Sequence, residues 1–220
     1  MCCTAPMNAI ELRAVTKAYD GRIAVHDISL CIECGERVAL AGPSGCGKTT
    51  ILRLVAGLEV PDSGSIRING TLMAEHGRNL VEPEQRHIGM VFQDLALWPH
   101  MTVHEHLDFA LRYDKRSTRT DRPSRIRQIL EMVRLSDRAR AKPGELSGGE
   151  QQRVALARAL AANPTIVLMD EPLSSLDPEL NLHLRREILR LHAELGFTLA
   201  YVTHSREEAA DVGSRVILMR

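Results

Sequence analysis

Apolar and polar residues alternate along the first third of the chain in short segments that turn signals separate. Residues 8–15, 24–33 and 65–69 have the alternation or the β-branched content that favours strands with one buried face. The pair Asp20-Gly21 and the triplet Asp62-Ser63-Gly64 fall between these segments and are typical of turns. This pattern predicts an antiparallel β subdomain.

Other segments are apolar without alternation, which is the pattern of parallel strands that are covered on both faces. They are residues 37–41, 165–169, 198–202 and 215–219. Residues 48–56 favour a helix that ends at Gly57, and residues 178–193 favour another helix between two of the buried strands. Alternating buried strands and helices predict an α/β fold with a mostly parallel sheet at its centre.

Residues 95–145 have a different composition, with many helix formers, polar residues and prolines. We expect this stretch to belong to an inserted helical subdomain. The predicted organisation is one domain that covers residues 8–220. Its α/β core and antiparallel patch comprise residues 8–93 and 163–220, and the helical subdomain comprises residues 94–162.

The overall composition is that of an ordinary globular domain, because 44% of the 220 residues are hydrophobic and 25% are charged. The 28 basic and 28 acidic residues balance, which gives no reason to expect nucleic acid as a partner. No apolar run reaches the roughly 18 residues of a membrane-spanning helix, and no secretion signal is recognisable. Five cysteines without regular spacing fit a reducing compartment. We expect a cytoplasmic location.

Residues 42–49 match the phosphate-loop pattern G-x-x-x-x-G-K-[ST] in full. Glycines let the backbone curl so that its N–H groups converge on a phosphate at a helix N-terminus. Lys48 is expected to reach the β- and γ-phosphates, and the Thr49 hydroxyl is expected to bind Mg²⁺. A chance glycine-rich turn is the alternative, but the predicted strand before it and helix after it favour a nucleotide site. The expected contacts are Gly42, Pro43, Ser44, Gly45, Cys46, Gly47, Lys48, Thr49 and Thr50.

A pair of acids, Asp170 and Glu171, follows the buried strand predicted over residues 165–169. The carboxyl end of such a strand is where ligands bind in open α/β sheets. Asp170 can hold Mg²⁺ through water, while Glu171 can polarise the water that attacks a phosphate. The alternative is a pair of solvated acids in a turn.

Residues 146–153 read Leu-Ser-Gly-Gly-Glu-Gln-Gln-Arg. Ser147 and Glu150 have the spacing of a capping box, which predicts that a helix begins here. Capping by Ser147 and a turn at Gly148 and Gly149 would suffice as an explanation. Paired glycines are nevertheless unfavourable at the start of a helix, and exposed N–H groups there make a second anion site.

Taken in this order and spacing, the three motifs resemble those of the ABC ATPase family, and the resemblance extends from about residue 10 to residue 219. It implies that two subunits enclose two ATP molecules head to tail. Ser147, Gly148 and Gly149 would then contact the ATP that the opposite subunit binds. A P-loop kinase would lack the motif at residues 146–153.

Single positions also resemble the family. Tyr19 falls where an aromatic ring stacks on adenine, although a lone tyrosine is more often a packing residue. Gln93 resembles the glutamine that reaches Mg²⁺ and links the nucleotide to the membrane partner. His204 resembles the histidine that contacts the γ-phosphate. Asp177 either belongs to a loop that communicates across the dimer or caps the next helix. The remaining histidines are expected at the surface.

The resemblance is to bacterial importer ATPases for sugars, polyamines, ferric iron or sulfate. It implies an ATPase in which Lys48, Glu171, His204 and Gln93 act in catalysis, with Mg²⁺ held by Thr49, Gln93 and Asp170. The partners would be a second ATPase subunit, identical or not, polytopic permease subunits and a solute-binding protein, at the inner face of the cell membrane. A soluble ABC ATPase with a role outside transport is the alternative.

Four apolar residues follow Gln93 closely, namely Leu95, Leu97, Trp98 and Met101. If they are exposed, they can form a docking groove for a membrane partner. If they are buried, they belong to the core of the helical insertion. Residue type alone does not separate these interpretations.

Overall fold

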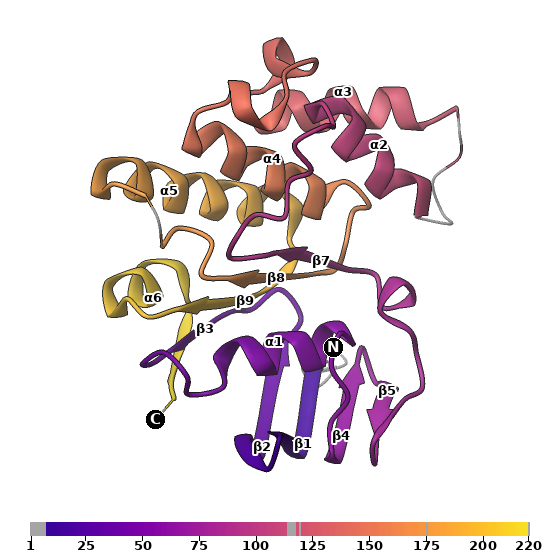
Figure 1. The fold of residues 1–220 in the computed structure, drawn as a ribbon, viewed down its shortest axis with the longest axis vertical. Helices are drawn as coiled ribbons and strands as arrows, with labels where there is room; N and C mark the ends of the chain where they lie inside the picture. Colours follow the sequence, from indigo (N-terminus) through magenta and orange to yellow (C-terminus); the bar gives the residue numbers. More distant parts are fainter. Residues whose placement is uncertain (1–7, 114–117, 119, 175, 220) are drawn as a thin grey trace, which may run out of the picture.

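The computed structural model describes residues 8–113, 118, 120–174 and 176–219, which form two sheets and a layer of helices (Figure 1). One sheet is antiparallel, with the order β2-β1-β4-β5-β6. Its strands are β1 (Asn8–Tyr19), β2 (Arg22–Glu33), β4 (Ser63–Ile68), β5 (Thr71–Glu75) and β6 (Arg78–Asn79). The predicted antiparallel subdomain is therefore confirmed.

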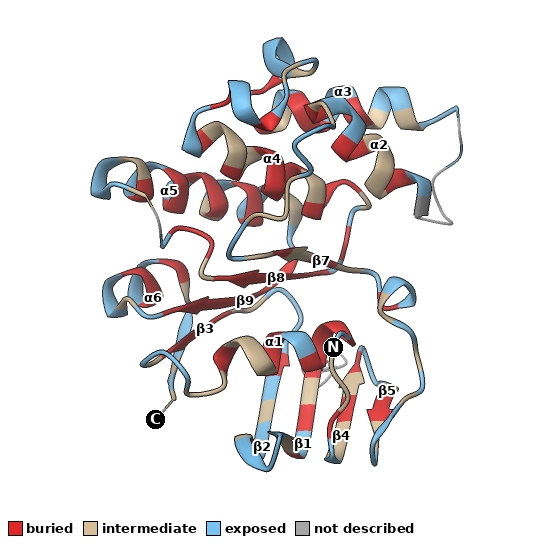
Figure 2. Cartoon of the chain, in the orientation of Figure 1, coloured by how far each residue is buried: buried red, intermediate tan, exposed pale blue. Residues whose placement is uncertain are grey.

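The other sheet is parallel throughout, with the order β10-β3-β9-β8-β7. Its strands are β3 (Arg37–Ala41), β7 (Ile88–Val91), β8 (Ile166–Asp170), β9 (Thr198–Thr203) and β10 (Arg215–Leu218). Every residue of β8 and β9 is buried, as the continuous red bands of Figure 2 show. Their apolar runs therefore lie between two covered faces, as predicted.

The helices cover both faces of this parallel sheet (Figure 1). Helix α1 lies on the side of the antiparallel sheet, and α2 to α5 lie on the opposite side. The helices are α1 (Lys48–Ala56), α2 (Val103–Tyr113), α3 (Arg122–Met132), α4 (Gly148–Leu160), α5 (Pro178–Leu195) and α6 (Arg206–Val212). Three short 3-10 turns are η1 (Pro83–Gln85), η2 (Ser136–Arg138) and η3 (Pro143–Glu145).

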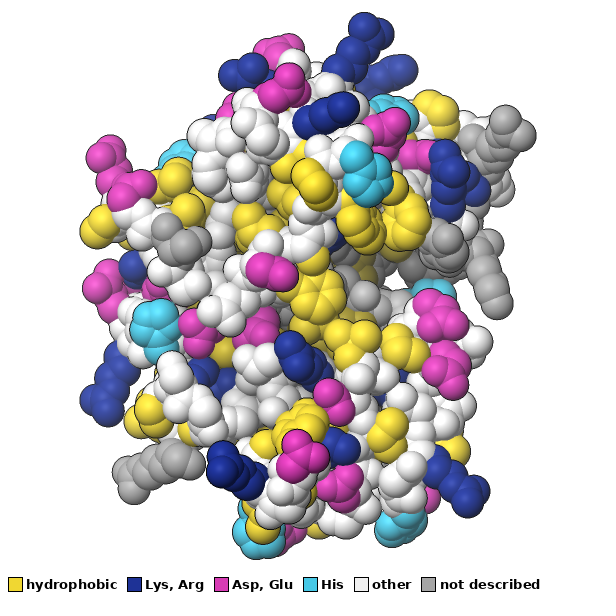
Figure 3. All heavy atoms as spheres, in the orientation of Figure 1, with side chains coloured by type: hydrophobic (Ala, Val, Ile, Leu, Met, Phe, Trp, Pro, Cys, Tyr) yellow, Lys and Arg dark blue, Asp and Glu magenta, His cyan; other side chains and the backbone are white. Residues whose placement is uncertain are grey.

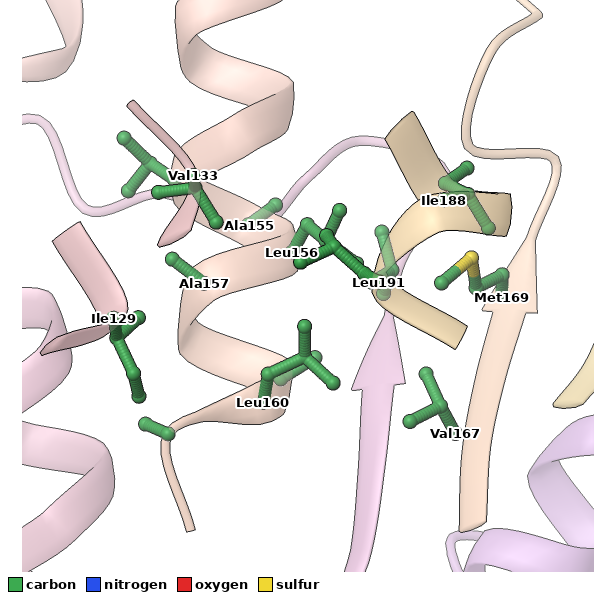
Figure 4. Packing of buried hydrophobic residues seen from close by; sticks show 14 of the residues in the cluster. Ile129, Val133, Ala155, Leu156, Ala157, Leu160, Val167, Met169, Ile188 and Leu191 are labelled. Atoms are coloured by element: carbon green, nitrogen blue, oxygen red, sulfur yellow. The ribbon is translucent and has the colours of Figure 1, made fainter. Parts of the chain in front are cut away.

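One apolar cluster joins the helical insertion to the parallel sheet. In it, Ile129 of α3 and Leu156 of α4 belong to the same buried group as Met169 of β8 and Ile188 of α5 (Figure 4). A second cluster fills the space between the other sheet face, α1 and the antiparallel sheet. The helical insertion thus shares its core with the sheet.

The short strands β5, β6 and β7 are absent from the sequence-based prediction. Asn69-Gly70 makes a tight turn between β4 and β5, with both residues in the left-handed region. β6 has two residues and β7 has four, so periodicity has too few positions to identify them. The sheets, rather than local propensity, define these strands.

The expectation that the remaining histidines lie at the surface is wrong for two of them. His106 is fully buried and His192 is 8% exposed. Their ring nitrogens have backbone partners, since His106 Nδ1 lies 2.8 Å from the Thr102 carbonyl oxygen and His192 Nε2 lies 3.1 Å from that of Gly35. Such hydrogen bonds offset the cost of burying an imidazole.

Arg86 is a buried cation that the sequence does not single out. It follows η1, is 4% exposed, and donates hydrogen bonds to the carbonyl oxygens of Leu54 at 3.1 Å and Val55 at 2.8 Å. It also donates to Oδ1 of Asn79 at 2.9 Å. Because the last carbonyls of a helix have no partner within it, Arg86 satisfies the end of α1 and ties it to β6.

We expect Arg86→Ala to lower the free energy of unfolding by about 2 to 3 kcal/mol, because it leaves buried carbonyl groups without donors. Denaturant unfolding measures the change. Arg13→Ala is the matched control, since the Arg13 side chain is 65% exposed and pairs with Glu11 on the surface, and it should cost less than about 1 kcal/mol. Equal losses in the two variants would contradict this role for Arg86.

Candidate functional site

The phosphate loop connects the end of β3 to the start of α1, as predicted. Gly47 precedes the helix with φ of 91°, and a Cβ atom there would lie 2.4 Å from the carbonyl oxygen of Ala24 on β2. At Gly42, a Cβ atom would lie 2.5 Å from the carbonyl oxygen of Met219. Neither position can accept a side chain without movement of neighbouring backbone, so packing explains both glycines.

Lys48 is 4% exposed, and its ammonium group is held by the loop itself. Nζ donates to the carbonyl oxygens of Gly42 and Pro43, both at 2.8 Å, and lies 3.8 Å from Sγ of Cys46. These partners are neutral dipoles, so the buried positive charge has no counter-ion among them. A phosphate anion would supply that charge, and this fits the predicted role of Lys48.

Thr49 and Asp170 bring two oxygen donors together at the carboxyl end of β8. The Thr49 hydroxyl donates to Oδ1 of Asp170 at 2.9 Å, and Asp170 is 4% exposed. Burial raises the pKa of the Asp170 carboxyl, which the hydrogen bond from Thr49 partly opposes. A hydroxyl and a desolvated carboxylate are hard oxygen ligands, so these residues fit Mg²⁺.

Glu171 and His204 form the other polar pair of the site. Nδ1 of His204 lies 3.0 Å from Oε2 of Glu171, across the ends of β8 and β9. Glu171 adopts φ of 44°, and its backbone N–H donates to the carbonyl oxygen of Val202 at 3.0 Å. A non-glycine residue in the left-handed region is strained, and such residues occur often at functional sites.

A cleft of about 420 Å³ brings several of these groups together, although Asp170 and His204 are not among its lining residues. Within the part of the chain that the structure describes, its lining includes Lys48, Thr49, Gln93 and Glu171. Gln93 is exposed and enters from the segment after β7. The other lining residues are Ala24, Ser44, Gly45, Gly47 and Thr50. The structure therefore brings together predicted residues that lie more than 120 positions apart in the sequence.

Tyr19 lies beside the phosphate loop at the end of β1. Its side chain is 38% exposed, and Nζ of Lys17 lies 5.4 Å from the ring centroid. Burial raises the pKa of the Tyr19 phenol, with Glu59 in the same direction and a hydrogen bond with Thr50 opposing it. An exposed ring next to the loop can stack on a base, so the adenine role of Tyr19 stays a prediction.

The segment from Ser147 to Gly149 does not line this cleft in the described chain. The predicted capping box is confirmed, since Ser147 Oγ accepts from the Glu150 backbone N–H at 3.3 Å and Glu150 Oε2 accepts from that of Ser147 at 2.8 Å. A Cβ atom at Gly149 would lie 2.8 Å from the Cδ1 methyl of Leu180, so a larger residue there would require that side chain to move. Gly148 is exposed, and no such contact accounts for it.

The opposite positions of α1 and α4 explain this separation. The two helices lie on opposite sides of the parallel sheet (Figure 1). The residues at the N-terminus of α4 accordingly do not line the cleft of their own chain, within the part that the structure describes. If this second anion site acts on a nucleotide, the nucleotide is bound by another subunit.

Two further polar groups near the site were missed from the sequence. Arg158 of α4 binds the backbone carbonyls of Leu95 and Ala96 in the segment after Gln93. Glu208 of α6 accepts hydrogen bonds from the hydroxyls of Thr203 at 2.7 Å and Tyr201 at 3.1 Å, behind His204. No local pattern marks these residues, because their partners lie far away in the sequence.

The phosphate loop, the acidic pair at the end of β8 and the parallel sheet define a P-loop nucleotide-binding protein. Over residues 25–174 the chain matches the family model described as ABC transporter. It is 46% identical over 211 residues to the spermidine/putrescine import ATP-binding protein PotA of Haemophilus influenzae, which covers 96% of this chain and 55% of that protein. It is 44% identical over 214 residues to the sulfate/thiosulfate import ATP-binding protein CysA of Pseudomonas aeruginosa, covering 96% and 64%.

Solved structures agree with these relatives. The fold is similar to the ATP-binding cassette MJ0796, solved as a dimer in a post-hydrolysis state with ADP and Pi. The TM-score is 0.83 at 35% identity, and the match covers 96% of this chain and 94% of that chain. The chain belongs to the ABC transporter family, as one of its ATP-binding proteins. It spans between about half and two thirds of the length of the two curated relatives described above.

Among the helices of the described ranges, none is both long enough and apolar enough to cross a bilayer.

We expect Asp170→Asn to raise the midpoint of thermal unfolding of the nucleotide-free protein at neutral pH. Because the pKa of the Asp170 carboxyl is raised, the folded state favours the protonated form. The free energy of unfolding therefore falls as the pH rises from the ordinary pKa of an aspartate, which applies to the unfolded chain, through the raised pKa of the folded chain. The amide keeps an oxygen for Thr49 and carries no charge to desolvate. Calorimetry at about pH 4.5 and 7.5 measures this, and the gain should be larger at the higher pH.

The exposed acid Asp137 in η2 supplies the control, since Asp137→Asn should leave the midpoint almost unchanged. An Asp170→Asn protein that melts earlier than the natural one at neutral pH would contradict the expectation.

Proposed function

We propose that this chain is an ATP-binding and ATP-hydrolysing subunit that dimerises around two ATP molecules and powers transport through membrane partners. The observation that carries the proposal is the convergence of Lys48, Thr49, Gln93 and Glu171 on one cleft, with His204 hydrogen-bonded to Glu171. The cleft combines a phosphate-binding loop with a carboxylate that can orient water. That combination is what phosphoryl transfer to water requires.

Hydrolysis in this proposal depends on positioning and charge. Lys48 leaves the loop carbonyls and neutralises the β- and γ-phosphates, and the loop N–H groups hold the β-phosphate. Thr49, Asp170 and Gln93 would hold Mg²⁺, which supplies charge neutralisation at the phosphate oxygens. Glu171 accepts a hydrogen bond from the attacking water and aligns it.

His204 has two roles in this proposal, one toward Glu171 and one toward the γ-phosphate. Its ring lies against the Glu171 carboxylate, which restricts the orientation of both side chains. The side chain of His204 is 53% exposed, so it can also turn toward the γ-phosphate of an ATP bound in the cleft of the same chain. Tyr19 would cover the adenine from the end of β1.

The active unit in this proposal is a dimer. Each cleft contains a phosphate loop and Glu171, whereas Ser147, Gly148 and Gly149 of the same chain do not line it in the described residues. Ser147, Gly148 and Gly149 of a second subunit would complete the site, and two identical or two related chains can satisfy this arrangement. The dimeric cassette that this fold resembles supports such a head-to-tail assembly.

Transport requires partners that cross the membrane, and we infer polytopic permease subunits bound from the inner, cytoplasmic side. On the face drawn in Figure 3, hydrophobic side chains gather across the middle of the molecule, where the segment between β7 and α2 runs. Leu95 and Leu97 are partly buried against the helical core, while Trp98 is 37% exposed. Leu95 and Leu97 therefore belong in part to the core of the helical insertion, and we propose Trp98 as a residue that meets a partner.

Import is the direction that the relatives favour, since those described above are import ATP-binding proteins. Their cargoes differ, so the cargo is not inferred for this chain. A solute-binding protein would be a further component of such an importer. A soluble ABC ATPase outside transport is the competing proposal.

We expect Glu171→Gln to lower the rate of ATP hydrolysis by about 10² to 10⁴-fold, because the amide cannot accept a proton from the attacking water. ATP binding and dimer formation should persist, since the phosphate loop is untouched. Phosphate release and nucleotide titration measure the two effects. The exposed Glu179→Gln on α5 is the control and should hydrolyse ATP at the natural rate; natural turnover by Glu171→Gln would exclude Glu171 as the base.

The transport proposal is tested by purification from membranes. A tagged chain, expressed in its own cells and extracted in mild detergent, should bring down polytopic subunits in a nucleotide-sensitive complex. Trp98→Glu should weaken that capture. Capture of soluble proteins alone would favour the competing proposal.

A further inference from the structure

The segment that carries Gln93 into the cleft has a strained backbone. Leu95 and Ala96 adopt φ of 59° and 45°, although neither is a glycine, asparagine or aspartate. The left-handed region is unfavourable for such side chains, by about 1 kcal/mol or more for each residue. Other contacts must therefore hold the segment in this shape.

Arg158 of α4 is the first of these contacts. Its guanidinium donates from Nη2 to the Leu95 carbonyl at 2.7 Å and from Nη1 to the Ala96 carbonyl. The same group lies 5.6 Å from the ring centroid of Trp98, within the range of a cation–π contact. A planar fork that binds two successive carbonyls fixes the direction of both peptide groups.

His106 of α2 is the second contact and is fully buried. Its Nε2 accepts a hydrogen bond from the Trp98 backbone N–H at 2.9 Å, and its Nδ1 lies 2.8 Å from the Thr102 carbonyl oxygen. The ring also stacks on the Trp98 indole, with the centroids 5.7 Å apart. Since a backbone N–H can only donate, Nε2 carries no proton and Nδ1 carries one.

A second proton on His106 would break this arrangement. Nε2–H would then point at the N–H of Trp98, so the hydrogen bond would become a repulsion. Burial is the main cause that lowers the pKa of His106, and the hydrogen bond to the Thr102 backbone opposes it. The positive charges of Arg158 on α4 and His100 in the preceding loop also lower this pKa, whereas Glu105 on α2 raises it. The neutral ring is therefore the form that the fold requires.

We propose that His106 is a positioning residue, which together with Arg158 holds the segment 93–98 so that Gln93 reaches the nucleotide cleft only while the imidazole is neutral. Arg158 lies on α4, the helix whose N-terminus bears Ser147. His106 and Arg158 thus form a clamp on segment 93–98. The clamp links Gln93, in the nucleotide cleft of one subunit, to the anion site at Ser147 that the same chain offers to the cleft of a second subunit. The effect on turnover rests on the proposed ATPase function, but the clamp itself does not.

The sequence contains one tryptophan, so the intrinsic fluorescence of the chain reports on Trp98 directly. A protonated imidazole stacked on an indole quenches its emission. In the nucleotide-free natural protein we expect Trp98 emission to fall as the pH drops below the ordinary histidine value of about 6.5. His100→Gln should keep this transition, because it leaves the stacked ring in place.

Two substitutions at His106 separate its acceptor from its proton. His106→Gln places an oxygen where Nε2 lies but cannot titrate, so the fluorescence transition should disappear. It should keep kcat within about twofold of the natural value at pH 7.5 and resist acid inactivation. His106→Phe keeps the ring without an acceptor, and it should lower kcat about tenfold while KM for ATP changes by less than about twofold.

Two outcomes would overturn the proposal. One is a fluorescence transition in His106→Gln at the same pH as in the natural chain, and the other is a natural kcat in folded His106→Phe. Circular dichroism and thermal melting establish whether each variant is folded, and Arg158→Lys, which loses the fork, should lower kcat as His106→Phe does. A chain without ATPase activity would contradict the proposed function. The pH dependence of Trp98 fluorescence without nucleotide would still test the clamp in that case.

Discussion

Parallel pairing of β3, β9 and β8 is the interaction on which the site depends. In this ladder Ala41 pairs with Thr203 and Asp170 pairs with Val202, so all three strands end at one edge of the sheet. The residues that follow them are the phosphate loop, His204 and Glu171. Because the strands are buried on both faces, a one-residue slip would move each side chain to the opposite covered face and disrupt the packing on both sides, so the register is strongly fixed. The chemistry of the cleft is thus set by the sheet that supports it.

The same sheet also divides the molecule's function between two faces. The phosphate loop opens α1 on one face, and the capping box at Ser147 opens α4 on the other. Both helices present free N–H groups, but the residues that open α4 do not line the cleft at the phosphate loop in the described chain. Between them runs the segment after Gln93, which Arg158 and His106 hold against α4 and α2. Shared packing of the helical insertion with the sheet fixes the helices on which these contacts depend.

Much of this fold could be predicted, and the failures have a common cause. The strands β1, β3, β8 and β9 and the helix α1 were recognised because each has enough residues for a clear periodicity or motif. The capping box at Ser147 was predicted correctly, because it needs only residues three positions apart. The short strands β5 to β7 and the burial of His106 and His192 were missed, since these depend on partners from distant segments. Arg86 was missed for the same reason, because the carbonyls it satisfies lie more than 30 positions earlier.

The sequence by itself determined the nucleotide chemistry. The phosphate loop, the acidic pair after β8 and the motif at residues 146–153 each consist of neighbouring residues. They can therefore be recognised from the sequence without a structure. Only the tertiary structure decided which of these groups share a cleft, because the distance between Lys48 and Glu171 depends on strand order and register. It alone placed the N-terminus of α4 away from that cleft and put a buried imidazole behind Trp98. Such relations arise from packing among segments far apart in the chain, and no local pattern of residues encodes them.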